Sequence, residues 1–186
     1  MNAAQLRALA HPLRVQLLQI LYVEGPATAS QLARRLGESS GATSYHLRAL
    51  HRAGFVDEGE RRNGRERWWQ RPERPVTIPN SVALDASDSE RAELQAAHAQ
   101  LQSVLLERDE QALGRWMEIR WDLPLEWQEA GGIGNFRMWA TASEMREFAT
   151  RVYDLAKPLR KPPDSPDTER RETHVTLRVL PQEPSP

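Results

Sequence analysis

Two short leucine-lined helices are predicted at the start of the chain. Residues 2–10 carry Leu6 and Leu9 at helical spacing, and Pro12 suits the first turn of a second helix. The apolar positions of that second helix share one face: Leu13, Leu17, Leu18 and Leu21. Because Gly25 and Pro26 interrupt the pattern, we expect both helices to end before residue 25.

Two further helices joined by a short turn are predicted in residues 28–54. Thr28 and Gln31 have the spacing of a capping box, and Gly37 supplies the left-handed residue that commonly ends a helix. After three intervening residues, a helix is expected from residue 41 to residue 53, closed by Gly54. Two helices with so short a connection have helix-turn-helix spacing.

A β-hairpin is predicted next. Residues 55–60 and 65–70 flank a turn that contains Asn63-Gly64, a pair that favours positive φ at both central residues. Four arginines lie on or beside that turn: Arg61, Arg62, Arg65 and Arg67. Guanidinium groups on a two-stranded ribbon can contact the phosphates that flank a groove. The alternative is an edge hairpin protected by its charge.

The second half begins with a Pro-rich connector and a long helix. Ser87 with Glu90 predicts a capping box that opens a helix reaching about Met117. The narrow apolar seam of this helix consists of Leu94, Ala97, Leu101, Val104, Leu105, Ala112 and Trp116. A helix of about 30 residues with such a seam typically packs on a partner helix. We interpret it as a dimerisation helix, with packing inside the chain as the alternative.

Four tryptophans lie close together in the sequence: Trp116, Trp121, Trp127 and Trp139. Bulky aromatic side chains line apolar ligand pockets, but they also fill the cores of small domains. Both interpretations remain open. The first makes these residues a candidate pocket for a small-molecule effector.

The end of the chain alternates between predicted strands and one helix. Residues 135–140 have a strand-like pattern, and Thr141 with Glu144 predicts a capped helix. Val175, Leu177 and Val179 alternate as in a last strand. A small α+β domain is therefore expected here.

The formal net charge of -1 hides an asymmetry between the two halves. Residues 1–75 contain 12 basic and 7 acidic residues, whereas residues 76–186 contain 13 basic and 19 acidic residues. Because phosphate contacts need clustered arginine or lysine, the first half is the part suited to a polyanion such as DNA.

Several classes of protein are disfavoured by the sequence. The chain has no cysteine, which excludes disulfides, thiolate zinc sites and thiol nucleophiles. Neither a secretory signal nor an apolar run of about 18 residues is found, so we expect a cytoplasmic protein without a membrane partner. No Ser/His/Asp grouping, phosphate-binding loop or metal cluster is recognisable, which argues against an enzyme.

The ordered elements of the first half carry a family resemblance. The stretches LRALAHPLRVQLLQIL, TASQLARRLG, SSGATSYHLRALHRAGFV and GRERWWQ resemble the winged helix-turn-helix of ArsR-type bacterial transcription regulators, over roughly residues 3–72. The resemblance implies that SSGATSYHLRAL is the recognition helix and that the hairpin is the wing. It also implies a homodimer on a pseudo-palindromic operator, usually acting as a repressor.

The candidate DNA contacts follow from the helical period. If Thr43, Leu47 and Leu50 face the core, the opposite face of the recognition helix turns outward. That face and the helix start present Ser39, Ser40, Gly41, Ser44, Tyr45 and Arg48. His46 is either a DNA contact or a buried or capping histidine, and Arg52 is either a phosphate contact or a solvated helix end.

The two tryptophans of the predicted hairpin are expected to lie on opposite sides of their strand. Trp68 and Trp69 alternate across a strand, so one of them should pack on the core.

Metal-sensing members of the family place two cysteines where this chain has Thr28 and Ser30, so thiolate coordination is excluded. The histidines are isolated along the sequence: His11, His46, His51, His98 and His174. We expect neither a metal nor another cofactor.

The sequence thus predicts a mainly α fold with small β elements. Residues 1–75 are expected to form an N-terminal winged helix-turn-helix, and residues 76–186 a long dimerisation helix with a small α+β carboxy-terminal domain for dimerisation and effector sensing. We predict a sequence-specific regulator that binds double-stranded DNA as a homodimer, with a small-molecule effector as a candidate partner. The alternative is a winged helix that binds another protein and no DNA.

Overall fold

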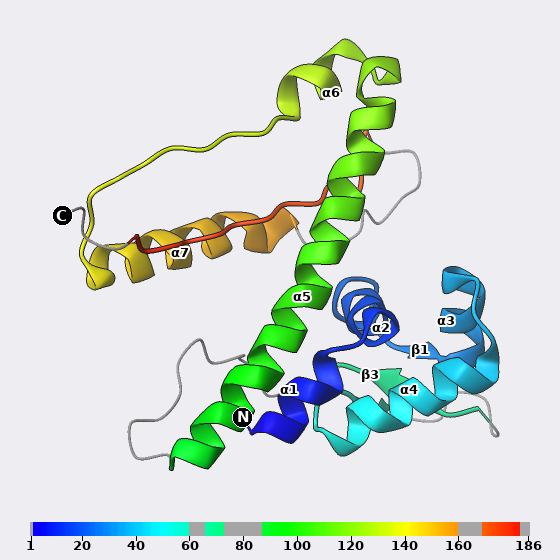
Figure 1. The fold of residues 1–186 in the computed structure, drawn as a ribbon. Helices are drawn as coiled ribbons and strands as arrows, with labels where there is room; N and C mark the ends of the chain where they lie inside the picture. The colour runs from blue at the N-terminus through cyan, green and yellow to red at the C-terminus, as the bar shows by residue number, and fades with distance from the viewer. Residues whose placement is uncertain (1, 60–65, 73–86, 160–168, 183–186) are drawn as a thin grey trace. The chain divides into compact units, whose positions relative to one another are not determined.

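The computed structural model describes residues 2–59, 66–72, 87–159 and 169–182 (Figure 1). The chain divides into two compact units, Met1–Arg108 and Asp109–Pro186. Helix α5, Asp88–Ile119, starts in the first unit and ends in the second. The predicted boundary between residues 75 and 76 lies outside the described residues.

The first two helices form where the leucine pattern predicts them. Helix α1, Ala3–Leu9, begins with a capping box in which the side chains of Asn2 and Gln5 each accept a hydrogen bond from the other's backbone N–H. Helix α2, Pro12–Val23, has proline at its first position, where no intrahelical N–H bond is lost.

The helix-turn-helix pair follows the predicted capping signals. Helix α3, Ala29–Leu36, begins with the capping box of Thr28 and Gln31 and ends at Gly37, whose φ of 69° is left-handed. Helix α4, Ser40–Arg52, starts one residue earlier than predicted because the Ser39 hydroxyl accepts the capping hydrogen bond from the Ala42 N–H.

The first unit also contains a small three-stranded antiparallel sheet. Its strands are β1, Ala27–Thr28, β2, Asp57–Gly59, and β3, Trp68–Gln70, in the order β1-β3-β2. In the hairpin, Glu58 lies opposite Trp69 and Gly59 opposite Trp68. The predicted hairpin is confirmed, while its Asn63-Gly64 turn lies outside the described residues. The sequence pattern gave no sign of β1.

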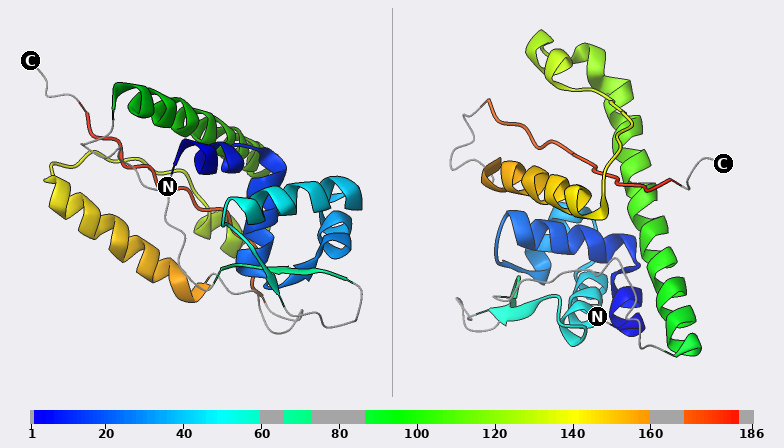
Figure 2. Two further views of the ribbon diagram at one scale, coloured as in Figure 1. Left: turned by 90° about the horizontal axis from the view of Figure 1, so that it is seen from below. Right: turned by 90° about the vertical axis from the view of Figure 1, so that its left-hand side faces the viewer.

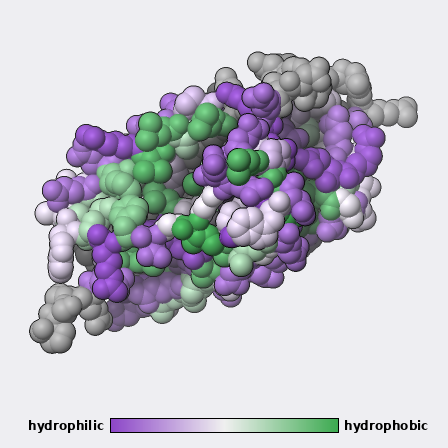
Figure 3. All heavy atoms as spheres, turned by 90° about the horizontal axis from the view of Figure 1, so that it is seen from above, coloured by the Kyte–Doolittle hydropathy of each residue, from purple (hydrophilic) through white to green (hydrophobic). Residues whose placement is uncertain are grey.

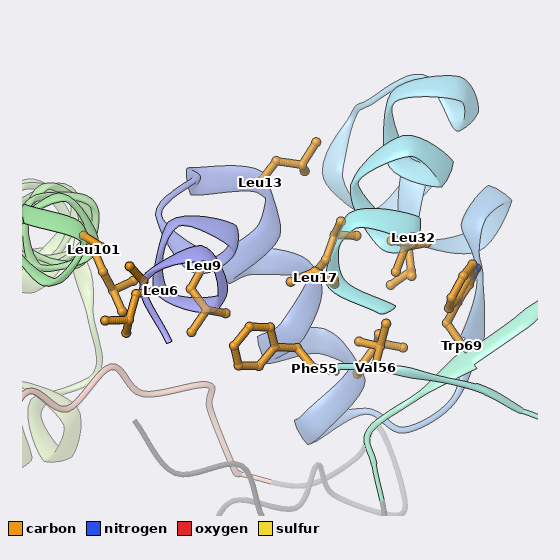
Figure 4. Packing of buried hydrophobic residues seen from close by; sticks show 14 residues of the cluster. Leu6, Leu9, Leu13, Leu17, Leu32, Phe55, Val56, Trp69 and Leu101 are labelled. Atoms are coloured by element: carbon orange, nitrogen blue, oxygen red, sulfur yellow. The ribbon is translucent and has the colours of Figure 1, made fainter. Parts of the chain in front are cut away.

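The hydrophobic core of the first unit lies among α1 to α4 and the sheet (Figure 4). Leu17, Leu47 and Val56 are completely buried, and Phe55 and Trp69 are 2% exposed. Figure 4 shows the Phe55 ring directed toward Leu9. Trp69 is thus the tryptophan that packs on the core, and Trp68 is only half-buried.

The first part of α5 also belongs to this core. Its start is capped as predicted, since the Glu90 N–H donates to the Ser87 hydroxyl and the Ser87 N–H to the Glu90 carboxylate. Ala97 and Leu101 are each 1% exposed within the same cluster as Leu6 of α1. This part of the predicted seam therefore packs inside the chain, which was the alternative interpretation.

The second unit consists of the end of α5, a turn η1 at Arg120–Asp122, helix α6 at Leu125–Ala130, helix α7 at Ala142–Ala156 and a turn η2 at Lys157–Leu159 (Figure 2). The capping box of Thr141 and Glu144 forms as predicted. The mainly α fold with a small sheet is confirmed.

The two strands predicted in the second unit are wrong for this structure. Residues 131–140 and 169–182 have no regular secondary structure. A strand requires a hydrogen-bonded neighbour, and the ladders of the described residues join only β1, β2 and β3. An alternating pattern alone therefore did not produce strands here.

Replacing Thr28 by alanine should destabilise the first unit. The Thr28 hydroxyl accepts a hydrogen bond from the Gln31 N–H at 3.3 Å, and the side chain is 2% exposed. We expect a loss of about 1 kcal/mol in the free energy of unfolding, measured by urea denaturation. Ser30→Ala is the matched control, since Ser30 is exposed in the same helix, and should change stability by less than about 0.5 kcal/mol. Equal effects for both variants would contradict the capping role.

Candidate nucleic-acid interface

Helix α4 is fixed to the first unit by one face. Thr43, Leu47 and Leu50, at helical spacing, are all completely buried. The opposite side is open: Gly41 and Arg48 are exposed, Tyr45 is 59% exposed, and Ser44 is half-buried. The predicted orientation of this helix is therefore confirmed.

The start of α4 presents backbone donors as well as hydroxyl groups. Ser39, Ser40 and Gly41 are exposed. Ser39 is the N-cap, so its hydroxyl oxygen already accepts the Ala42 N–H at 3.1 Å. The N–H groups of the first turn of a helix have no intrahelical acceptor, and they carry the positive end of the helix dipole. This end of α4 can therefore bind an anion such as a DNA phosphate.

The wing is described only at its base. Arg61, Arg62 and Arg65 lie outside the described residues. Arg67 forms an ion pair with Glu58 at 3.0 Å across the hairpin, and its guanidinium carbon lies 5.7 Å from the centre of the Trp69 ring. Because both charged side chains are exposed by 40% or more, the pair contributes little stability. The sequence pattern gave no indication of this pairing.

Arg52 is exposed in the last turn of α4. A cation at this position interacts favourably with the negative end of the helix dipole. The position is compatible with both sequence-based interpretations, a phosphate contact and a solvated helix end.

His46 lies in a small cluster that joins α4 to the start of α2. Its ring centre is 4.3 Å from that of His11, and the Tyr45 ring meets it edge-on at 5.2 Å. The Nδ1 atom of His11 accepts the Leu13 N–H at 3.2 Å and so caps α2. Within the described residues, the buried Nδ1 of His46 has no hydrogen-bond partner. The ring of His46 thus packs against α2 while Tyr45 beside it faces outward.

Burial and nearby positive charge favour the neutral form of both histidines by lowering the pKa of each. Burial lowers the pKa of His46, and the nearby His11 and Arg14 lower it further, against an opposing effect of Glu38. Burial followed by Arg14 likewise lowers the pKa of His11. The sequence reasoning missed His11 and Arg14 as neighbours of the recognition helix, because more than thirty residues separate them from His46.

The stability of the first unit should therefore fall in mild acid. In the unfolded chain, His11 and His46 bind protons near the ordinary histidine pKa of 6.5. In the folded chain the pKa of each is lower, so each binds its proton only at lower pH. The stabilisation is complete above 6.5 and is lost as the pH falls below it. Urea denaturation at several pH values would measure this loss, and His46→Phe should reduce it. An unchanged pH dependence in that variant would contradict the role of His46.

The four tryptophans of the proposed effector pocket are not brought together. Trp116 and Trp121 line one shallow pocket, where the guanidinium carbon of Arg120 lies 5.2 Å and 3.9 Å from their ring centres. Trp127 lines a different pocket, with Arg171 at 5.5 Å from its ring centre. Trp139 is fully exposed. The predicted four-residue pocket is therefore not formed, because the four side chains belong to different parts of the chain: α5, η1, α6 and the segment before α7.

The described residues contain neither a cluster of metal ligands nor a membrane-spanning helix. No group of three or more His, Asp or Glu side chains is close enough together to hold a metal ion. None of the described helices has the length and apolar character needed to cross a bilayer.

Comparison with known protein families supports the assignment of the first unit. Residues 9–59 match the model of a helix-turn-helix domain family. The amino-terminal part of the chain is therefore similar to a helix-turn-helix domain over residues 9–59. The matched segment covers α2, α3, α4 and β2 of the helix-turn-helix and ends at the base of the wing. The helix-turn-helix supports a role of this chain in DNA-binding transcription regulation.

Two solved structures are similar to part of this helix-turn-helix protein. HlyU from Vibrio cholerae N16961 and its reduced form each share 24% sequence identity with the chain, at a TM-score of 0.33. The similarity covers 52% of this chain, 86% of HlyU and 83% of reduced HlyU. No curated protein matches the sequence.

Proposed function

We propose that this regulator binds a pseudo-palindromic operator as a homodimer and acts as a repressor. The observation that carries the proposal is the open face of α4. Its other face packs on the first unit through three completely buried residues, so the exposed side chains lie on the side away from the core. A fixed helix with polar residues on its free side has the properties needed to enter the major groove of DNA.

The side chains on this face suit different parts of a duplex. Arg48 has the reach and the paired donors to contact guanine or a phosphate, and Tyr45 can pack against a thymine methyl group or donate a hydrogen bond. Gly41 and Ser44 allow close approach because they are small. We propose that these residues, with Ser40, read the operator.

Phosphate contacts would position the helix over its site. The first turn of α4, which includes Ser39 and Ser40, offers backbone N–H donors, and Arg52 lies at the other end of the helix. We propose that the arginines of the predicted wing contact the DNA backbone beside the groove. Such contacts set orientation and affinity and carry no sequence information.

A homodimer would double these contacts and fix their spacing. Two recognition helices related by a two-fold axis read half-sites about 34 Å apart, roughly one turn of DNA. We propose a binding function without catalysis for this chain. The pocket lined by Trp116, Arg120 and Trp121 is our candidate site for a small-molecule effector that relieves repression.

A salt titration of binding to random duplex DNA tests the proposal. If the chain neutralises several phosphates, the logarithm of the affinity should fall linearly with the logarithm of salt concentration, with a slope of about -0.9 per contacted phosphate. A salt-independent affinity, or no binding at low salt, would contradict the DNA function. That result would favour the alternative, a winged helix that binds another protein.

A further inference from the structure

Arg14 is a cation of α2 that has no anionic partner among the described residues. Hydrophilic side chains cover much of the face drawn in Figure 3, so an exposed arginine alone does not indicate a ligand. Arg14 differs because its side chain is half-buried, and its Nε is shielded from solvent without a hydrogen-bond partner in the described residues. A shielded donor without an acceptor costs free energy, and the cost is larger when the group is charged.

Other arginines of the first unit pair with carboxylates. Arg35 forms an ion pair with Glu24 at 3.5 Å, and Arg67 forms one with Glu58 at 3.0 Å. Arg14 forms no such pair with any carboxylate in the part of the chain that the structure describes. Its positive charge is therefore not balanced by a direct contact there.

The side chains around Arg14 do not supply the missing negative charge. Burial and then Arg14 lower the pKa of His11, and burial, His11 and Arg14 lower that of His46, so neither ring is an anion or a counter-charge. Glu38 has the opposite effect on both histidines, but it makes no ion pair with Arg14 among the described residues. Burial also lowers the pKa of Arg14 itself, an effect that the nearby Tyr45 hydroxyl opposes.

The terminal nitrogens of the Arg14 guanidinium are open to a ligand. Neither of them forms a hydrogen bond in the described residues, and neither is shielded from solvent as Nε is. Two neighbouring N–H groups of a guanidinium match the spacing of two phosphate oxygens. This end of Arg14 therefore has the chemistry of a phosphate-binding group.

Arg14 lies beside the open face of α4. Helix α2 packs on α4 (Figure 1), and the ring centres of His11 and His46 are 4.3 Å apart at this contact. Arg14 follows His11 by three residues in α2 and lies near Tyr45, which is 59% exposed. An α-helix is about 10–12 Å across and the major groove about 12 Å wide, so α4 would fill the groove. Side chains of a helix packed beside it then lie near the sugar–phosphate backbone.

We propose that Arg14 is a DNA contact outside the helix-turn-helix pair, and that its guanidinium binds a backbone phosphate beside the bases that Tyr45 faces. The inference rests on the DNA-binding function proposed above and extends that interface to α2. The phosphate supplies the negative charge that the described residues do not provide. Because a phosphate contact carries no sequence information, Arg14 strengthens binding to every duplex alike.

Salt titrations of binding to random duplex DNA test this contact in the full chain. Arg14→Gln removes the charge, so it should lower the affinity by about 10-fold and make the salt slope shallower by about 0.9. Arg14→Lys keeps the charge and should retain most of the slope. Arg7→Gln is the matched control, because Arg7 is an exposed arginine that already pairs with Glu93 at 3.9 Å. Its slope should stay close to that of the parent.

A spectroscopic measurement on the parent chain tests the contact even if Arg14→Gln does not fold. The NMR signal of the Arg14 Nε–H should shift when random duplex is added, whereas that of the Arg7 Nε–H should not. An Arg14 signal that stays unchanged while the DNA binds would overturn the contact.

The titrations distinguish failure of this inference from failure of the DNA function. A steep slope in the parent with the same slope in Arg14→Gln would exclude Arg14 from the interface and leave the DNA function intact. Equal changes in Arg14→Gln and Arg7→Gln would indicate a general effect of net charge and would also overturn the specific contact. Binding of the parent that does not depend on salt would contradict the DNA function and the Arg14 contact together.

Discussion

Phe55→Ala is expected to lower the free energy of unfolding of the first unit by about 3–5 kcal/mol. The ring is 2% exposed and belongs to the cluster that includes Leu9, Leu17 and Val56 (Figure 4). Its removal would take away buried apolar surface and leave a cavity, since the surrounding helices can only partly collapse. Urea denaturation followed by circular dichroism would measure the change.

Tyr45→Ala is the matched control for this substitution. Tyr45 is an aromatic residue of the same unit, but it is 59% exposed, so its loss should change stability by no more than about 0.5 kcal/mol. Comparing the two stability changes distinguishes the loss of a buried aromatic side chain from the loss of an exposed one. A loss below about 1 kcal/mol for Phe55→Ala would contradict the core that holds α4 in place.

Arg48→Ala is expected to reduce the preference for operator over random DNA by about 1–3 kcal/mol, which is roughly 5- to 150-fold. Arg48 is exposed on α4, so the substitution should leave folding unchanged. The loss arises because a guanidinium that contacts a base edge distinguishes one base pair from another. Competition binding of operator against random duplexes would measure it, once an operator has been selected.

Arg52→Ala serves as the control for Arg48→Ala. It lies on the same helix and is equally charged, but it is placed at the carboxy-terminal end. If Arg52 contacts a phosphate, its loss should weaken binding to all sequences alike and reduce the salt slope by about one. Identical losses of preference in both variants would contradict the assignment of Arg48 as a base-reading residue.

The sequence predicted correctly those features of the structure that depend on residues a few positions apart in the chain. Capping boxes at Thr28 and Thr141 and the left-handed Gly37 act over a few positions, and their spacing marked helix ends closely. The apolar period placed Thr43 and Leu47 correctly on the buried face of α4. Local signals therefore predicted the helix-turn-helix and the direction of its open face.

Contacts between distant residues could not be predicted in this way. The stacking of His11 on His46 depends on how α2 and α4 pack, and no periodicity within either helix indicates it. The four tryptophans are close in sequence, yet Trp139 is fully exposed while Trp116 and Trp121 share a pocket. The strands expected at residues 135–140 and 175–179 require pairing partners, which a pattern in one segment does not supply.

The most direct test of the DNA-reading role of α4 is selection from a pool of random duplexes, carried out in parallel with the parent chain and with Arg48→Ala. We predict that the parent enriches a pseudo-palindrome with half-sites about 10 base pairs apart. We predict that Arg48→Ala enriches it weakly or with relaxed preference at one position in each half-site. No enrichment by the parent, or the same enrichment by both proteins, would contradict the role of α4 in reading the operator.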